Sequence, residues 1–128
     1  MRVLLDTHTF LWFALDDASL GAAARASIVD PGTEKLISPA PYWEIAIKMS
    51  TGKLRLGQPF EQFMHAGIEG NGFTVLPITV KHAAVVATLP FHHRDPFDRL
   101  LVAQALAEDI PVATADAVFD RYGVRRVW

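Results

Sequence analysis

The stretch HHRDPFDRLLVAQALAEDIPVAT (residues 92–114) combines a helix signal with a strand signal. Asp95 followed by Pro96 is a favourable helix start, because aspartate caps free backbone N–H groups and proline suits the first helical turn. The helix predicted over 95–109 is apolar almost all round, which is typical of a helix buried on several sides. The short apolar run PVAT (111–114) then predicts a buried strand.

The same alternation of strands and helices extends over the rest of the chain. Short apolar runs predict further strands at RVLL (2–5), KLIS (35–38), FTVLPI (73–78) and VRRVW (124–128). Periodic segments between the strands predict helices at 7–15, 19–29, 41–50, 59–69 and 79–88, the second of them with Ser19 as its N-cap. This order indicates an α/β fold in which helices cover both faces of a mostly parallel sheet.

Composition narrows the class of protein. The 128 residues are 51% hydrophobic and 20% charged, which suits one folded domain over residues 1–128. The net charge of −2 excludes a strongly basic nucleic-acid binder, but it allows a nuclease that makes few phosphate contacts. Without cysteine there is no disulfide and no thiolate metal site. The apolar N-terminus is interrupted by polar residues, so we expect a soluble, cytoplasmic protein that does not enter the membrane.

Asp98 has two interpretations. As the third residue of its helix it interacts favourably with the helix dipole and can complete a capping box, each effect being worth about 1 kcal/mol. However, Asp98 shares its helix face with the apolar residues Leu101 and Ala105. A carboxylate on an inward face needs a partner or a cation.

Three further acids are predicted near the same edge of the sheet. Asp6 ends the first strand, Asp116 follows the fourth, and Glu44 lies early in the helix after the second. Sites in parallel sheets form at the carboxyl ends of the strands, and the helix that Asp98 opens should begin there. Converging carboxylates repel each other by about 4 kcal/mol per pair at 4 Å and an effective dielectric near 20. An oxygen-only cluster suits Mg²⁺ or Mn²⁺, which supports metal-assisted phosphodiester hydrolysis.

Each of these acids also has a structural alternative that the sequence leaves open. Asp6 can cap the first helix, and Asp116 can cap a short turn. Glu44 and Lys48 can form an ordinary surface pair at i,i+4 spacing.

Histidine and aromatic residues give no distinct signal of a site. The histidines lack metal-ligand spacing. An imidazole near the substrate is one interpretation, but we favour surface positions for His8, His65, His82, His92 and His93. The aromatic residues of the first predicted helix suit either the core or a face that a partner covers, namely Phe10, Trp12 and Phe13.

Four segments, in this order, resemble a known family. They are LLDTHTFLW (4–12), WEIAIK (43–48) with GKL (52–54), HHRDPFDRLLVAQA (92–105) after Leu-Pro, and TADAVFDRYGV (114–124). Together they closely resemble the PIN-domain nucleases, specifically the VapC-type toxins of bacterial toxin–antitoxin modules. The resemblance covers essentially the whole chain. It implies a three-layer α/β/α sandwich around a short parallel sheet.

The resemblance also implies a site and a function. The acidic residues that match the family's catalytic and metal-binding positions are Asp6, Glu44, Asp98 and Asp116, with Thr7 and Thr114 as accessory hydroxyls. The implied cofactor is Mg²⁺ or Mn²⁺, and the implied reaction is endonucleolytic cleavage of RNA, commonly tRNA or ribosomal RNA. The implied partners are a cognate antitoxin and a second toxin chain in a homodimer or larger assembly. One departure is the segment before WEI, where Pro39 and Pro41 flank Ser38 and stiffen the loop.

Substrate contacts and rival functions remain open at this stage. Candidates for phosphate contacts are Lys48, Arg94 and Arg99, although Lys48 and Arg99 suit salt bridges equally well. A phosphatase of the haloacid-dehalogenase type requires a second aspartate where this chain has His8. A non-catalytic PIN-like module that binds RNA or protein is the remaining alternative, against which four intact acids argue.

Overall fold

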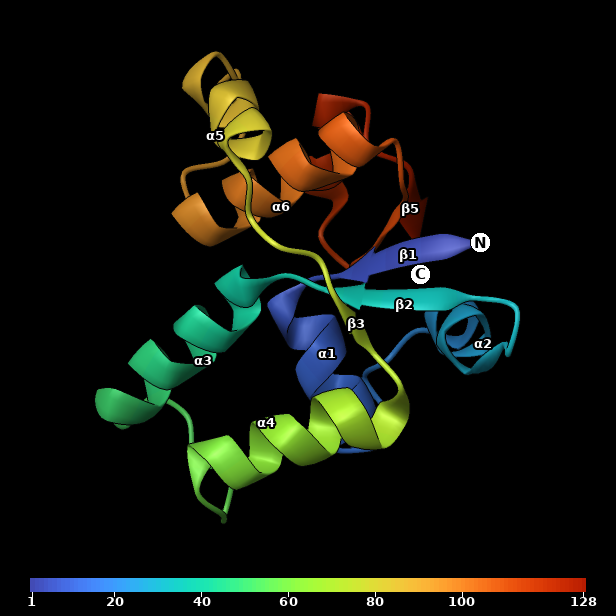
Figure 1. Cartoon of the computed structure of the whole chain (residues 1–128), viewed down its shortest axis with the longest axis vertical. Helices are drawn as coiled ribbons and strands as arrows, with labels where there is room; N and C mark the ends of the chain where they lie inside the picture. Colours follow the sequence, from blue (N-terminus) through green and yellow to red (C-terminus); the bar gives the residue numbers. More distant parts are fainter.

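The computed structural model describes all residues, 1–128, as a sheet between two layers of helices (Figure 1). The strands are β1 (Arg2–Leu5), β2 (Glu34–Ile37), β3 (Thr74–Val75), β4 (Val112–Ala113) and β5 (Arg126–Val127). The helices are α1 (Thr7–Ala14), α2 (Ala22–Val29), α3 (Pro39–Ser50), α4 (Phe60–Ile68), α5 (Val80–Ala87) and α6 (Pro96–Glu108), with short 3₁₀ helices η1 (Glu69–Asn71) and η2 (Ala117–Tyr122). No helix is both long enough and apolar enough to span a membrane.

The sheet has the strand order β3-β2-β1-β4-β5, and every neighbouring pair is parallel. The prediction of an α/β sandwich around a parallel sheet is therefore confirmed. Helices α1 to α4 cover one face of the sheet, and α5 and α6 cover the other (Figure 1). All strands run in one direction, so the segments that follow β1, β2 and β4 leave the sheet at the same edge.

Strand periodicity divides the core into two layers. Val3 and Leu5 of β1 pack with Phe10 in one buried cluster, whereas Leu4 packs with Leu101 of α6 in the other. Successive side chains of a strand point to opposite faces, which explains the division. Both clusters are needed to bury β1, and its three apolar residues are fully buried.

Helix α6 confirms the prediction for 95–109 and shows how the chain makes it. Asp95 is the N-cap, and its Oδ1 accepts the N–H groups of Phe97 at 2.8 Å and Asp98 at 3.0 Å. Pro96 occupies the first helical turn, as expected. Asp95 thus caps the helix through Oδ1, and this cap places Asp98 in the first turn of a largely buried helix.

Three local predictions are corrected. The helix predicted from Ser19 begins only at Ala22, because the backbone carbonyl of Trp128 accepts the N–H of Ala23 at 3.1 Å and takes the place of a local cap. The strand predicted over 73–78 is shorter, since β3 ends at Val75. Leu76 still donates its N–H to Ile37, but Pro77 has no N–H with which to continue the pairing. Helix α3 begins two residues earlier than predicted.

The early start of α3 changes the interpretation of its two prolines. Ser38 is the N-cap and accepts the N–H of Ala40 at 3.2 Å, while Pro39 and Pro41 lie in the first turn. The prolines therefore start the helix instead of stiffening a loop, and Ser38 is fully buried under them. The hydroxyl of Ser38 thus acts as the N-cap of α3.

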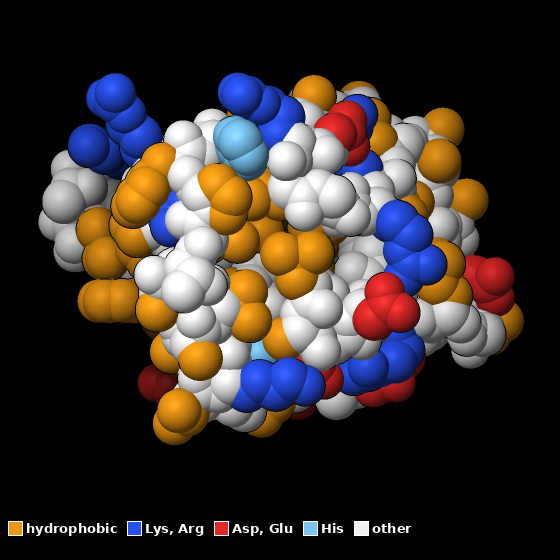
Figure 2. Space-filling model, turned by 90° about the horizontal axis from the view of Figure 1, so that it is seen from above, with side chains coloured by type: hydrophobic (Ala, Val, Ile, Leu, Met, Phe, Trp, Pro, Cys, Tyr) orange, Lys and Arg blue, Asp and Glu red, His pale blue; other side chains and the backbone are white.

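The outer surface of the α5–α6 layer carries exposed apolar side chains. Figure 2 looks onto the molecule from this side and shows them gathered in the middle of the face, with Lys and Arg side chains around them. The two most exposed large apolar residues of the chain are Val80 at the start of α5, 86% exposed, and Phe91 in the α5–α6 loop, 82% exposed. A surface of this kind is suited to a contact with another protein.

Candidate active site

Asp6 leaves β1 at the carboxyl edge of the sheet and is almost completely buried. Its Oδ1 accepts the N–H of Thr9 at 2.9 Å and caps α1, so the structural alternative for Asp6 is correct for that oxygen. Its Oδ2 accepts the hydroxyl of Thr114 at 2.5 Å, across the sheet. One carboxylate thus starts a helix and also faces the end of β4.

Thr114 connects two of the predicted acids. Its hydroxyl donates to Asp6 and accepts the backbone N–H of Asp116 at 3.0 Å. Asp116 in turn caps η2, because its Oδ1 accepts the N–H of Val118 at 2.9 Å. The predicted turn cap is therefore present, and it leaves the second oxygen, Oδ2, directed toward the α5–α6 loop.

Glu44 does form the predicted ion pair with Lys48, at 2.8 Å, but the surface location expected for that pair is wrong. Only 9% of the Glu44 side chain is exposed. Its other oxygen accepts the hydroxyl of Thr7 at 2.6 Å, which ties α3 to the first turn of α1. Both oxygens of this carboxylate are held in place by donors.

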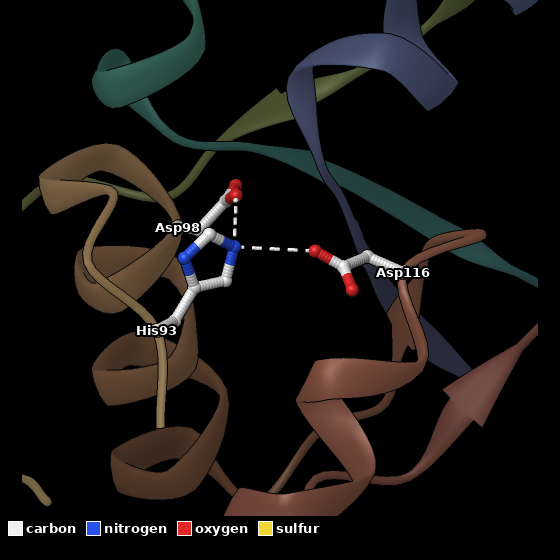
Figure 3. A group of neighbouring side chains, drawn as sticks. All are labelled: His93, Asp98 and Asp116. Atoms are coloured by element: carbon white, nitrogen blue, oxygen red, sulfur yellow. Dashed lines mark hydrogen bonds and ion pairs between the residues drawn. The ribbon is translucent and has the colours of Figure 1, made fainter. Parts of the chain in front are cut away.

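Asp98 lies opposite Asp116, and the two aspartates flank the imidazole of His93 (Figure 3). Its Oδ2 lies 3.0 Å from Nε2 of His93. The pKa of Asp98 is raised to about 7, chiefly by burial and also by the negative charges of Asp95, Asp6 and Glu44, while His93 lowers it. Burial and the neighbouring carboxylates both disfavour the ionised form of Asp98, and no Lys or Arg pairs with it.

His93 is a site residue that the sequence analysis missed, since all histidines were expected at the surface. Its Nε2 also lies 3.2 Å from Oδ2 of Asp116, so it bridges both acids. Its backbone N–H donates to the hydroxyl of Tyr122 at 2.8 Å, and its Nδ1 accepts the N–H of Asp95 at 3.1 Å. The available signal was its position beside the Asp95–Pro96 helix start, because that start also places Asp98.

His82 also departs from the expected surface position. It is 1% exposed and bridges α5 to α6 through Glu108, at 3.1 Å from Nε2. Its Nδ1 accepts the N–H of Thr79 in a capping box. The histidine is therefore part of the helix packing.

The three basic candidates for phosphate contacts differ in placement. Arg99 is buried, donates to the carbonyls of Leu89 and Pro90 at 3.2 and 2.8 Å, and stacks on Phe91. Its role is therefore structural, although it holds backbone carbonyls and does not form the salt bridge that was the alternative. Lys48 is held by Glu44 but remains partly exposed. Arg94 is exposed, and its guanidinium makes no hydrogen bond or ion pair.

The site residues form one connected network with an oxygen-rich centre. It runs from Lys48 and Glu44 through Thr7 to the adjacent Asp6, and on through Thr114 and Asp116 to His93 and Asp98. Ligand atoms of Asp98, Asp116 and His93 lie within 4.8 Å of one another, whereas Asp6 and Glu44 lie outside this closest group. Two carboxylates that converge in a site with excess negative charge fit a hard divalent cation.

Comparison with known proteins identifies the family. The PIN domain model matches residues 3–125, so the chain belongs to the PIN domain family. The fold matches a chain of VapBC2 from Rickettsia felis, bound to a DNA fragment from their promoter, with a TM-score of 0.72 at 14% identity and 100% coverage of both chains. It also matches VapBC-1 from nontypeable Haemophilus influenzae (TM-score 0.65, 20% identity, 98% and 96% coverage) and FitAcB from Neisseria gonorrhoeae (0.64, 18%, 97% and 95%). At these identities the matches establish the fold. No curated protein matches the sequence significantly.

Proposed function

We propose that this protein is a divalent-metal-dependent endoribonuclease, the VapC-type toxin of a toxin–antitoxin module. The observation that carries the proposal is the gathering of carboxylates from four separate segments at one edge of the sheet. Thr114 and His93 link Asp6, Asp116 and Asp98, and Glu44 is held by Thr7, the residue after Asp6. PIN domains are generally nucleases, and the carboxylate site lies where a parallel sheet forms its sites. The substrate proposed is RNA of the tRNA or ribosomal RNA class, which rests on the resemblance of the motifs to VapC toxins.

In this proposal Asp98 and Asp116 hold the cation, and Asp6 adds negative charge beside them. A bound Mg²⁺ or Mn²⁺ polarises the phosphodiester, lowers the pKa of water and stabilises the leaving oxygen. Thr114 fixes the relative positions of Asp6 and Asp116 through its two hydrogen bonds. Glu44, held by Thr7 and Lys48, completes the acidic wall, and one of the four carboxylates accepts the proton of the attacking water.

Basic groups at the rim contribute to RNA binding. Arg94 is exposed and unpaired one residue after His93, so its guanidinium is free to contact a phosphate. Lys48 has two N–H donors beyond the one that Glu44 uses. With few such groups, binding is expected to depend only modestly on salt.

The proposed protein partners are an antitoxin and a second copy of the chain. The solved structures that share the fold include VapBC and FitAB assemblies. The exposed apolar side chains of the α5–α6 face, with Val80 and Phe91, provide surface for a protein contact. In the toxins that the motifs resemble, the antitoxin also fills the acidic site, often with an arginine, and Asp98 and Asp116 offer carboxylates for such a side chain.

The experiment that tests this function is incubation of total bacterial RNA with the purified, antitoxin-free protein in Mg²⁺, Mn²⁺ or EDTA. We expect discrete fragments that require metal and that Asp98→Asn abolishes. Asp109→Asn is the matched control, because it makes the same chemical change at the exposed far end of α6, in a left-handed conformation that asparagine tolerates. Folded protein that cleaves no RNA in any condition would favour a non-catalytic binding module.

A further inference from the structure

His93 lies between the two aspartates of the acidic site, and two roles fit its position there. Its Nε2 lies 3.0 Å from Asp98 and 3.2 Å from Asp116. Neighbouring ligands of an octahedral ion with bonds of about 2.1 Å are about 3 Å apart, so these distances alone suit a third metal ligand. They equally suit an N–H group that donates to both carboxylates.

The other ring nitrogen, Nδ1, distinguishes a metal ligand from a hydrogen-bond donor. Nδ1 accepts the backbone N–H of Asp95 at 3.1 Å, and a backbone N–H can only donate. Nδ1 therefore carries a lone pair, and the ring proton is on Nε2. An Nε2 that carries a proton has no lone pair for a cation, but it is a donor aimed at the two acids.

The backbone around His93 keeps the ring in this arrangement. The hydroxyl of Tyr122 accepts the N–H groups of both His92 and His93, at 3.0 and 2.8 Å. The buried guanidinium of Arg99 holds the start of the same loop through two carbonyls. The other tautomer, with the proton on Nδ1 and Nε2 free for a metal, would set a protonated Nδ1 against the N–H of Asp95. This change removes one hydrogen bond and opposes two donors.

We propose that His93 is a positioning residue, which donates its Nε2–H to Asp98 and Asp116 and stays outside the ligand set of the metal. The inference rests on the proposed metal site and adds a residue to it. Donors beside ligating carboxylates orient them, and loss of such a donor typically weakens metal binding about 10- to 100-fold. The ligand set then remains all-oxygen, which suits Mg²⁺ and Mn²⁺ better than metals that prefer imidazole.

The test is Mn²⁺ binding to the full chain, followed by electron paramagnetic resonance, in the wild type and in His93→Gln and His93→Leu. The glutamine amide can donate from nearly the same position as Nε2, so we expect a Kd within about 3-fold of the wild type. Leucine cannot donate, and we expect its Kd to rise about 10- to 100-fold. His92→Leu is the control, since this neighbouring ring packs on Tyr122 and contacts neither acid. Circular dichroism confirms that each variant is folded.

Pulsed electron paramagnetic resonance on the same samples shows directly whether a nitrogen of His93 binds Mn²⁺. We expect no ¹⁴N coupling of the strength that directly bound imidazole gives, and a long-range ¹H–¹⁵N spectrum of the metal-free protein should show the proton of His93 on Nε2. Strong nitrogen coupling that His93→Gln removes would overturn this proposal while the metal site stands. Wild-type affinity in folded His93→Leu would also overturn it. Absence of Mn²⁺ binding to the wild type would overturn the proposed function as well as this inference.

Discussion

Replacement of Asp98 by asparagine should stabilise the metal-free protein, although Asp98 is the residue most central to the proposed function. In the wild type this carboxylate is buried near Asp6 and Glu44, and the cost of its charge is visible in its raised pKa. Asparagine has the same shape without the charge, and its oxygen can still accept from Nε2 of His93. The substitution therefore removes an unfavourable charge and keeps the hydrogen bond.

The size of the effect follows from the pKa. One pH unit corresponds to about 1.4 kcal/mol, so a rise from the ordinary value of 3.8 to about 7 costs the ionised wild type about 4 kcal/mol at most. Water reaches the 21% of the Asp98 side chain that is exposed, so we expect about 2–4 kcal/mol. For a chain of this length that corresponds to about 6–15 °C in melting temperature.

The effect has a defined dependence on pH. Asp98 binds its proton more tightly in the folded state, so the stability due to protonation is fully present below the unfolded pKa near 3.8. This stability is lost as the pH rises through about 7. The advantage of the asparagine variant should therefore be near zero at pH 4 and complete by pH 8.

The assay is thermal unfolding in EDTA from pH 4 to 8, with Asp109→Asn as the control. The control should unfold at nearly the wild-type temperature at every pH, because Asp109 is exposed. If Asp98→Asn is no more stable than the wild type at pH 8, or if its advantage does not change with pH, the charge of Asp98 does not destabilise the metal-free fold.

Three further predictions concern the metal, a hydroxyl and a buried guanidinium. Mg²⁺ or Mn²⁺ at a hundred times its Kd should stabilise the wild type by about 2.7 kcal/mol, which calorimetry should record as several degrees that Asp98→Asn lacks. Thr114→Val should lower the free energy of unfolding in urea by about 2–3 kcal/mol and impair cleavage, because Asp6 loses a donor and the part-buried N–H of Asp116 loses its acceptor. A neutral result would mean that this link is dispensable. Arg99→Met should accelerate amide hydrogen exchange at His92 by freeing the loop, and unchanged exchange would contradict the anchoring role.

The sequence predicted the layers and the acids because both depend on local signals. Helix α6 has a complete local start in Asp95 and Pro96, and β1 has a continuous apolar run, so both were found close to their observed bounds. Asp6, Glu44 and Asp98 follow from the rule that parallel strands end at one edge. The rule places residues at the edge but does not state which atoms meet there.

The features that the sequence did not reveal depend on contacts between distant segments. The start of α2 is held by the carbonyl of Trp128, about a hundred residues away, and its N-cap Gly21 makes no side-chain bond that would distinguish it from Ser19. His93 lies in the site because its loop is held by Tyr122 of η2, and the spacing of the histidines in the sequence does not predict that contact. The spacing of Glu44 and Lys48 alone left an ordinary surface pair open, and the contact of Glu44 with the distant Thr7 gave no signal in the sequence.

The proposed metal site can be tested by the position of Mn²⁺ in crystals of the protein, located by its anomalous diffraction. We expect an ion about 2 Å from carboxylate oxygens of both Asp98 and Asp116, at the edge of the sheet where Asp6 lies, with Nε2 of His93 beyond bonding distance. An acidic site that takes up no ion at millimolar Mn²⁺, or an ion bound only elsewhere on the molecule, would contradict the proposed site.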